Sequence, residues 1–387
     1  MQQMTTAEPV PDFQKRQASG TSGIRIGLSE RLSLQTIEGR QTVFAEKSQL
    51  VFEPDAASCA ILALLDTPLP LTALFDQLLP AFAGNRKAVA AMLVDWSKAG
   101  LIDAFLPHDC DSELPSATVC LPALDATVDL QVHGEDTGWF DCYRHLPEPS
   151  NSGRRIQTWQ CPELGIIKVT GEQGRIVPRH MLAAGFRYGL VESILNRTEC
   201  IVLHCASLIK NDRAMLLLGA SGAGKSTLAM FASQNGLELG GDDIALFDPA
   251  SRRILPLALP LTLKQGSWPM IARSSWSRES QEAVLREDEV EVVYLPLSRT
   301  VSRAPLAVRA LILLDRDRQA EPEPELSAWS KIDCLRHLCN ESRSHSGTAS
   351  VEDMQALLGM LDQSEPLTLR YANATEAGGM LGSQFGG

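Results

Sequence analysis

The stretch from Gly219 to Thr227, Gly-Ala-Ser-Gly-Ala-Gly-Lys-Ser-Thr, most constrains how this chain can fold. It fits the pattern G-x-x-x-x-G-K-[ST], in which a glycine-rich loop wraps around phosphate groups. The apolar run 214–218 before it predicts a buried parallel strand, and residues 227–232 after it predict a helix. Strand, loop and helix in this order direct backbone N–H groups and the positive end of a helix dipole at a polyphosphate.

Each part of this loop has an expected contact with phosphate. The glycines let the backbone curl where a Cβ atom would clash. Lys225 is expected to reach the β- and γ-phosphates, and the Ser226 hydroxyl is expected to bind Mg²⁺. A turn that binds nothing is the alternative, which the matching strand and helix disfavour. The predicted nucleotide-binding residues are Gly219, Ala220, Ser221, Gly222, Ala223, Gly224, Lys225, Ser226 and Thr227.

The composition is that of an ordinary globular protein. The 387 residues are 44% hydrophobic and 21% charged, and they suffice for two or three domains. The formal net charge of −12 disfavours nucleic acid as a partner, because such a contact needs a basic stripe. We see no signal peptide and no apolar run as long as a transmembrane helix, so no membrane partner is expected. Nine scattered cysteines without a C-x-x-C pair argue against disulfides and zinc and favour a cytoplasmic location.

The predicted fold class is α/β, with a small α+β module before a larger nucleotide-binding domain. Composition and periodicity divide the chain into a disordered lead-in (1–23), the small module (24–106), a polar linker (107–118), the larger domain (119–375) and a flexible glycine-rich tail (376–387).

The small module is predicted to be winged-helix-like. Alternating apolar residues predict strands at 32–37, 41–45 and 49–52, and a closing β-segment at 101–102. Helical spacing predicts helices at 56–65, 69–79 and 85–99. Asn85 is the predicted N-cap of the last helix, and Gly100 is its predicted end.

In the larger domain the pattern predicts β-rich segments before the loop and a mixture of helices and strands after it. Strands are expected at 127–132, 155–160, 164–169, 200–204, 311–315 and 367–371, and helices at 178–196, 328–340 and 351–362.

Phosphoryl transfer also needs carboxylates to hold Mg²⁺ and to take the acceptor proton. Two places in the sequence could supply them. Asp242 and Asp243 are adjacent in a glycine-rich turn, 17 residues after Lys225, and Asp315 ends the aliphatic run 311–314. A simple hairpin turn and a simple strand end are the alternatives, and the pattern alone leaves both open.

Three features in order resemble the catalytic domain of HPr serine kinase/phosphorylase and its relatives. His204 precedes Gly219 by 15 residues, the Asp242–Asp243 pair follows the loop, and Pro260-Leu-Thr-Leu-Lys264 resembles a Pro-x-x-Leu-Lys segment of the HPr-kinase-related branch. The resemblance covers residues 119–375. It implies a mixed sheet with flanking helices, ATP and Mg²⁺ as cofactors, and a homo-oligomer.

The resemblance also implies roles for these residues. Asp242 would be the general base and a metal neighbour, Asp243 would support it, and His204 would orient the acid pair. The acidic and arginine-containing signature of true HPr kinases is not found downstream; Lys264 stands in that region and is a candidate substrate contact. HPr itself is therefore not the expected substrate. His180 and Arg187 are further candidates for a place near the site.

The small module resembles the PqqD family, on the pattern from Phe52-Glu-Pro-Asp to Ala99-Gly-Leu-Ile102. This implies that residues 24–106 bind the leader peptide of a ribosomally made, modified peptide, with a strand edge and the third helix holding the extended peptide. DNA binding is the alternative for a winged-helix-like module, but the helix 85–98 carries only three basic residues.

Four hypotheses follow. The leading one is an ATP-dependent kinase acting on a Ser or Thr hydroxyl of a peptide or protein. A kinase for a small hydroxylated metabolite, a nucleotide-gated adaptor without catalysis, and a motor- or transporter-type ATPase using Asp315 are the others, in that order.

Overall fold

The computed structural model describes residues 23–106, 115–123, 126–149, 153–195, 199–271, 276, 283–286, 288–297, 304–317, 323–343, 347 and 349–386. Most of the predicted linker and nearly all of the predicted lead-in lie outside these residues. The chain forms two compact units. The first unit is made of residues up to Ser116, Val132–Glu135 and Gln157–Leu182, and the second of Ala117–Gln131, Asp136–Ile156 and the chain from Ala183 onward.

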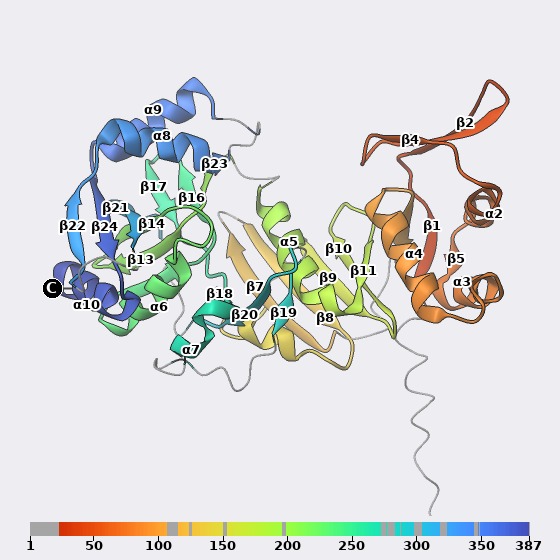
Figure 1. The fold of residues 1–387 in the computed structure, drawn as a ribbon, viewed down its shortest axis with the longest axis horizontal. Coiled ribbons are helices and arrows are strands. Elements are labelled where there is room, and N and C mark those ends of the chain that lie inside the picture. The colour runs from red at the N-terminus through yellow and green to blue at the C-terminus, as the bar shows by residue number, and fades with distance from the viewer. Residues whose placement is uncertain are drawn as a thin grey trace, which may run out of the picture. The chain divides into compact units, whose positions relative to one another are not determined.

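Residues 23–106 of the first unit form two small sheets and three α-helices (Figure 1). One sheet has the order β5-β1-β6, and the other the order β2-β3-β4. The strands are β1 (Arg25–Leu28), β2 (Leu32–Ile37), β3 (Arg40–Ala45), β4 (Leu50–Phe52), β5 (Leu69–Pro70) and β6 (Ile102–Phe105). The helices are α2 (Ala56–Leu64), α3 (Leu71–Leu78) and α4 (Arg86–Lys98).

Local sequence signals place the helices of this unit as predicted. Asn85 accepts a hydrogen bond from the Ala88 N–H at 3.1 Å and so caps α4. Asp55 caps α2 in the same way, through the Ser58 N–H at 2.7 Å. Gly100 follows α4 with a φ of +75°, a conformation that glycine adopts at little cost.

The first unit extends beyond the predicted module 24–106. Its hydrophobic core includes Trp159, Cys161, Leu164, Ile166 and Ile176 as well as side chains of the module. The helix α4 packs against β11 (Arg175–Pro178), because a short module needs further apolar surface to cover its helix.

Two hydrogen-bonded contacts join the module to this later segment. The Ile176 N–H donates to the Ser97 hydroxyl of α4 at 3.0 Å. Ala104 of β6 and Gly174 exchange two backbone hydrogen bonds of 2.8 Å each. The sequence had assigned residues 157–182 to the other domain, whereas these contacts place them in the first unit.

A five-stranded sheet has the order β11-β10-β9-β8-β7. The division between the two units falls within β8 and β9. The strands predicted at 127–132, 155–160 and 164–169 are confirmed, and β7 and β11 were not foreseen. The bounds are β7 (Ala117–Ala123), β8 (Ala126–His133), β9 (Arg155–Gln160) and β10 (Leu164–Val169).

The second unit is built on a six-stranded sheet of order β15-β13-β14-β21-β24-β22. The three strands β14, β21 and β24 are mutually parallel, and the remaining pairs are antiparallel. Their bounds are β13 (Ala206–Lys210), β14 (Arg213–Leu218), β15 (Glu238–Gly241), β21 (Ala307–Arg316), β22 (Glu325–Ala328) and β24 (Glu365–Tyr371).

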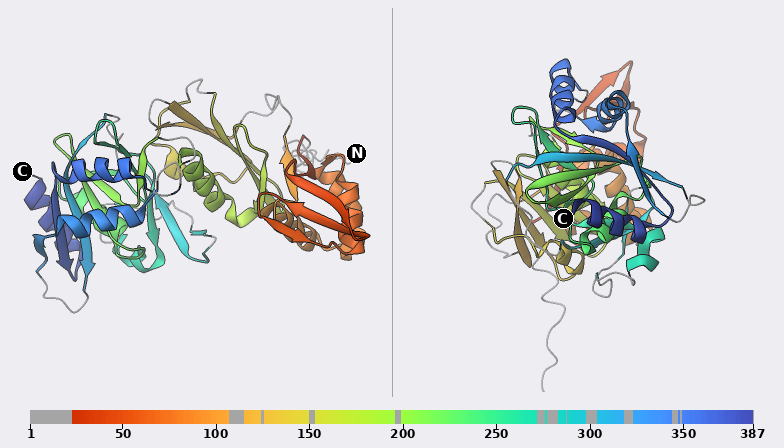
Figure 2. Two further views of the ribbon diagram at one scale, coloured as in Figure 1. Left: turned by 90° about the horizontal axis from the view of Figure 1, so that it is seen from above. Right: turned by 90° about the vertical axis from the view of Figure 1, so that its left-hand side faces the viewer.

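Helices cover both faces of this sheet. Figures 1 and 2 show α6 (Lys225–Gln234) and α10 (Ala374–Phe385) against one face, and α8 (Lys331–Glu341) and α9 (Val351–Leu361) against the other. The other helices of this unit are α5 (Leu182–Leu195) and α7 (Trp268–Ile271). The result is a mixed α/β fold, as the sequence predicted.

Two smaller sheets complete the second unit. One has the order β17-β16-β12-β23, and the other the order β18-β20-β19. Their strands are β12 (Ile201–Leu203), β16 (Ala245–Asp248), β17 (Arg253–Leu255), β18 (Leu261–Lys264), β19 (Val284–Leu285), β20 (Glu291–Leu295) and β23 (Ser342–Arg343).

The prediction of a flexible tail at 376–387 is wrong for the residues described, because they form most of α10. Leu381 and Phe385 are buried in the core. The glycines allow close packing on α6: a Cβ atom on Gly378 would lie 2.7 Å from the Phe231 Cβ, and one on Gly382 would lie 2.4 Å from the Asn235 carbonyl oxygen. The glycine-rich sequence suggested disorder, but these glycines lie on the face of α10 that packs against α6, where the lack of a side chain lets the two helices approach closely.

Two further observations concern the described part of the chain. None of its helices is long and apolar enough to cross a membrane. None of its eight cysteines forms a disulfide within this part of the chain.

Candidate active site

The predicted strand, loop and helix lie together as β14, the glycine-rich loop and α6. Residues 214–218 of β14 are buried, and the strand runs parallel to β21. Gly224 is the N-cap of α6 with a φ of +100°, and a Cβ atom there would lie 2.8 Å from the Tyr371 hydroxyl. That hydroxyl donates to the Ala223 carbonyl at 3.1 Å. The hydrogen bond from Tyr371 of β24 therefore fixes the loop, and position 224 requires glycine because a Cβ atom would clash with this hydroxyl.

Lys225 lies under its own loop. Its side chain is only 8% exposed, and the ammonium group donates to the Gly219 carbonyl at 2.6 Å and to the Ala220 carbonyl at 3.3 Å. Burial lowers the pKa of Lys225, and the negative charge of Asp242 opposes that shift. The Lys225 ammonium group thus lies at the loop, which is where the sequence motif requires a cation for phosphate binding.

Asp242 is buried beneath the loop. It is 1% exposed and accepts hydrogen bonds with both oxygens, Oδ1 from the Ser226 hydroxyl at 3.0 Å and Oδ2 from the Thr262 N–H at 2.8 Å. Burial, and next the charge of Asp243, raise the pKa of Asp242 to about 7. The bond to Ser226 joins the acid pair to the first turn of α6.

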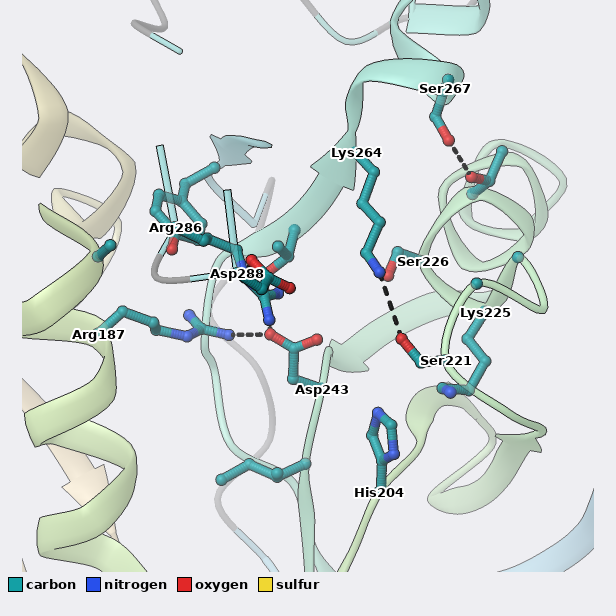
Figure 3. A pocket seen from close by; sticks show the side chains of 18 of the residues that line it. Arg187, His204, Ser221, Lys225, Ser226, Asp243, Lys264, Ser267, Arg286 and Asp288 are labelled. Atoms are coloured by element: carbon teal, nitrogen blue, oxygen red, sulfur yellow. Dashed lines mark hydrogen bonds and ion pairs between the residues drawn. The ribbon is translucent and has the colours of Figure 1, made fainter. Parts of the chain in front are cut away.

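Asp243, by contrast, faces the pocket. Its Oδ2 accepts from the Arg187 Nη2 at 3.0 Å and from the Thr262 hydroxyl at 2.9 Å (Figure 3). The Asp243 side chain is 36% exposed, and that of Arg187 only 7%. Burial alone would raise the pKa of Asp243, but the Arg187 guanidinium holds it below its ordinary value.

The backbone of Asp243 is also unusual. Its φ of +70° lies in the left-handed region, which costs energy for a residue other than glycine, although aspartate tolerates it better than most. Thr262 bonds to both acids, with its N–H on Asp242 and its hydroxyl on Asp243. A strained backbone conformation persists where neighbouring groups hold it, and here the hydrogen bonds from Thr262 and Arg187 hold Asp243.

Lys225, Asp243, Arg187 and Thr262 line one pocket with a volume of about 650 Å³. Helix α5 contributes one face to it, through Ala184, Arg187, Tyr188 and Val191 at helical spacing. Of the residues predicted for the site, the pocket is lined by Ser221, Gly222, Gly224, Lys225, Ser226, Thr227, Asp243, His204 and Lys264. Gly219, Ala220, Ala223 and Asp242 are not among its lining residues.

His204 lies at the pocket but contacts a residue that the sequence had not suggested. Its Nδ1 atom is 3.6 Å from the Oε2 atom of Glu341, at the end of α8. Burial, and next the charge of Lys225, lower the pKa of His204. The hydrogen bonds that orient the acid pair come instead from Ser226, Thr262 and Arg187, so the structure does not give His204 the orienting role that the resemblance implied.

Lys264 reaches the loop from the end of β18. Its ammonium group donates to the Ser221 hydroxyl at 3.3 Å, and Figure 3 shows this contact apart from the one between Arg187 and Asp243. Close by, the hydroxyls of Thr227 and Ser267 share a hydrogen bond of 2.7 Å. A second cation thus lies beside the loop.

Sequence reasoning missed several lining residues. Arg286 and Asp288 form an ion pair of 3.2 Å at the pocket, and Arg316 lies beyond the aliphatic run of β21. Asp315, the alternative acid of the sequence analysis, does not line the pocket. Arg187 had been a candidate and is present, whereas His180 belongs to the first unit. No local motif signals these residues, because they reach the pocket from separate elements.

Comparison with known proteins adds little to this geometry. No family model and no curated protein matches the sequence. Among solved structures, the chain is similar to the Hpr(Ser) kinase/phosphatase from Coxiella burnetii, with 11% identity over 44% of this chain and 79% of that chain, and a TM-score of 0.21. A TM-score this low does not define a shared fold, so the function has to be inferred from the pocket.

Proposed function

We propose that this protein is an ATP- and Mg²⁺-dependent kinase that transfers the γ-phosphoryl group to a Ser or Thr hydroxyl of a peptide or protein. One observation carries the proposal: the hydrogen bond from Ser226 to Asp242 joins a loop of phosphate-binding sequence to a pair of adjacent acids, of which Asp243 lines the pocket. Phosphoryl transfer needs these two parts together.

The donors at this point suit Mg²⁺. Mg²⁺ prefers oxygen ligands and is commonly held by one or two carboxylates together with substrate phosphates. The Ser226 hydroxyl and the Asp242 carboxylate are such donors, 3.0 Å apart. When bound there, Mg²⁺ would neutralise charge on the phosphate oxygens.

We assign separate roles in nucleotide binding, proton transfer and positioning to the residues of the site. The loop N–H groups, Lys225 and Lys264 bind and orient the triphosphate. Asp243 accepts the proton from the acceptor hydroxyl as the oxygen bonds to the transferred phosphorus, and the bond to the leaving phosphate breaks. Arg187 holds the Asp243 carboxylate ionised and in place. This assigns to Asp243 the role that the resemblance suggested for Asp242, since Asp243 lines the pocket and Asp242 does not.

The peptide is proposed to bind the first unit. Five exposed apolar side chains on its β2-β3-β4 sheet support this: Leu34, Ile37, Phe44, Leu50 and Val51. β4 is an edge strand, and an edge can pair with an extended peptide. The third helix, suggested by the resemblance, packs against β11 instead, so we place the peptide on β4.

The test is label transfer from γ-labelled ATP, with Mg²⁺, to short peptides encoded beside the gene. We expect transfer to one peptide by the full chain, its loss in Asp243→Asn and its retention in Asp315→Asn. Transfer lost in Asp315→Asn but kept in Asp243→Asn would contradict the role proposed for Asp243, and ATP hydrolysis that depends on Asp315 with no peptide labelled would favour the ATPase hypothesis.

A small-molecule acceptor is the second candidate. The pocket volume of about 650 Å³ lies within the range of small-molecule sites. Transfer to a metabolite, with no peptide labelled, would establish it. Nucleotide binding without any transfer would favour an adaptor.

A further inference from the structure

We infer that Arg316 binds the phosphates of the nucleotide, from the side of the loop opposite the acid pair. This rests on the proposed function, because it assumes that the loop holds a nucleoside triphosphate. Arg316 is the last residue of β21 and lines the pocket.

The topology of the sheet places Arg316 and the acid pair on opposite flanks of the loop. In the order β15-β13-β14-β21, the loop follows β14, and the acids follow β15 on one side. On the other side, β21 runs parallel to β14, with Leu313 opposite Leu218, so both strands end at the same edge. Ligands of such sheets bind beyond the carboxyl ends of parallel strands.

The guanidinium lies beside the loop backbone. The Cδ and Nη1 atoms of Arg316 are each 3.9 Å from the position that a Cβ atom on Gly224 would have. Gly224 is the N-cap of α6, where backbone N–H groups are expected to meet a phosphate. A phosphate at this helix terminus would therefore lie close to Arg316.

Arg316 is also available for a ligand. Within the described part of the chain its guanidinium makes no ion pair and no hydrogen bond, whereas the next residue, Asp317, pairs with Arg370 at 3.0 Å. The planar fork of an arginine matches two oxygens of one phosphate. With Lys225 and Lys264, Arg316 makes a third cation around the loop.

The position of Arg316 on the β21 side of the loop indicates which phosphates it contacts. The acceptor and the transferred phosphoryl group must lie near Asp243, on the β15 side of the loop. Arg316 is on the β21 side, so it contacts the phosphates that remain with the nucleoside diphosphate. It should therefore contribute to the affinity for ADP as much as for ATP.

The experiment is calorimetric titration of the full chain with MgATP and with MgADP. We expect Arg316→Gln to weaken both affinities by about tenfold and Arg316→Lys to weaken them less. Arg370→Gln is the matched control, because Arg370 is an exposed arginine on the adjacent strand β24 outside the pocket, and it should bind as the wild type does.

Three results would overturn the inference. Unchanged affinities in Arg316→Gln would remove Arg316 from the site. A loss confined to MgATP would place it at the γ-phosphate. A wild-type chain that binds neither nucleotide would refute the proposed function itself, which separates that failure from the first two. Because Arg316 is exposed, the thermal midpoint of the variant should match that of the wild type.

Discussion

The Ser226 hydroxyl donates a hydrogen bond of 3.0 Å to the Oδ1 atom of Asp242. One partner lies in the first turn of α6 and the other follows β15, so this contact links the end of the glycine-rich loop to the acid pair. Among the described residues no cation bonds to this buried carboxyl group, and its burial therefore has a cost for stability.

We expect Asp242→Asn to stabilise the nucleotide-free protein at neutral and higher pH. The folded-state pKa of Asp242 is raised to about 7, so the unfolded chain releases this proton first and stability falls as pH rises from about 4 to 7. Asparagine removes that dependence and can keep both hydrogen bonds, accepting from the Thr262 N–H and donating to the Ser226 hydroxyl.

The gain at pH 8 should be roughly 1–4 kcal/mol. Urea unfolding between pH 4 and 8, without nucleotide or metal, measures it. Asp315→Asn serves as control and should follow the wild type. If Asp242→Asn loses stability with pH as steeply as the wild type, Asp242 is not the titrating group.

Arg187→Met should move the acid limb of the kcat profile to higher pH. Without the guanidinium, burial acts on Asp243 with less opposition and raises its pKa. Arg187→Lys keeps the charge and should restore part of the shift. Kinetics over a pH series check this prediction, and a lowered kcat with an unmoved profile would mean that Arg187 has only a structural role.

Gly382→Ala should destabilise the protein by about 1–3 kcal/mol, because the added methyl group has no room between α10 and α6. Gly138→Ala is a matched control, since a Cβ atom there meets no other atom within 4 Å. Chemical denaturation of the two variants gives the comparison. Equal stabilities would show that α10 does not pack closely on α6.

Val51→Asp should abolish binding of the substrate peptide without affecting nucleotide affinity. Val51 is 65% exposed on β4, and a charge there opposes burial beneath a bound peptide. Val351→Asp is the control, with 63% exposure on α9. Fluorescence anisotropy of a labelled peptide separates the two, and equal loss in both variants would argue against a site on β4.

Much of the fold could be predicted because its signals are local. The loop sequence from Gly219 to Thr227, the cap at Asn85 and the helical spacing of α4 depend on neighbouring residues, and each indicated the observed element. The glycines of α10 were misinterpreted, because a glycine at a tight helix contact looks like a glycine in a flexible tail when the partner helix is not known.

The sequence by itself determined a loop of phosphate-binding sequence, its place between a buried strand and a helix, and the pair of adjacent acids further along the chain. It could not decide which acid faces the pocket, since Asp242 and Asp243 are neighbours of identical chemistry. The tertiary structure decided this through Thr262, Arg187 and the burial of Asp242. It also brought Arg316 to the loop. Exposure and charge pairing arise only when elements distant in sequence pack together, and for that reason no local pattern could reveal them.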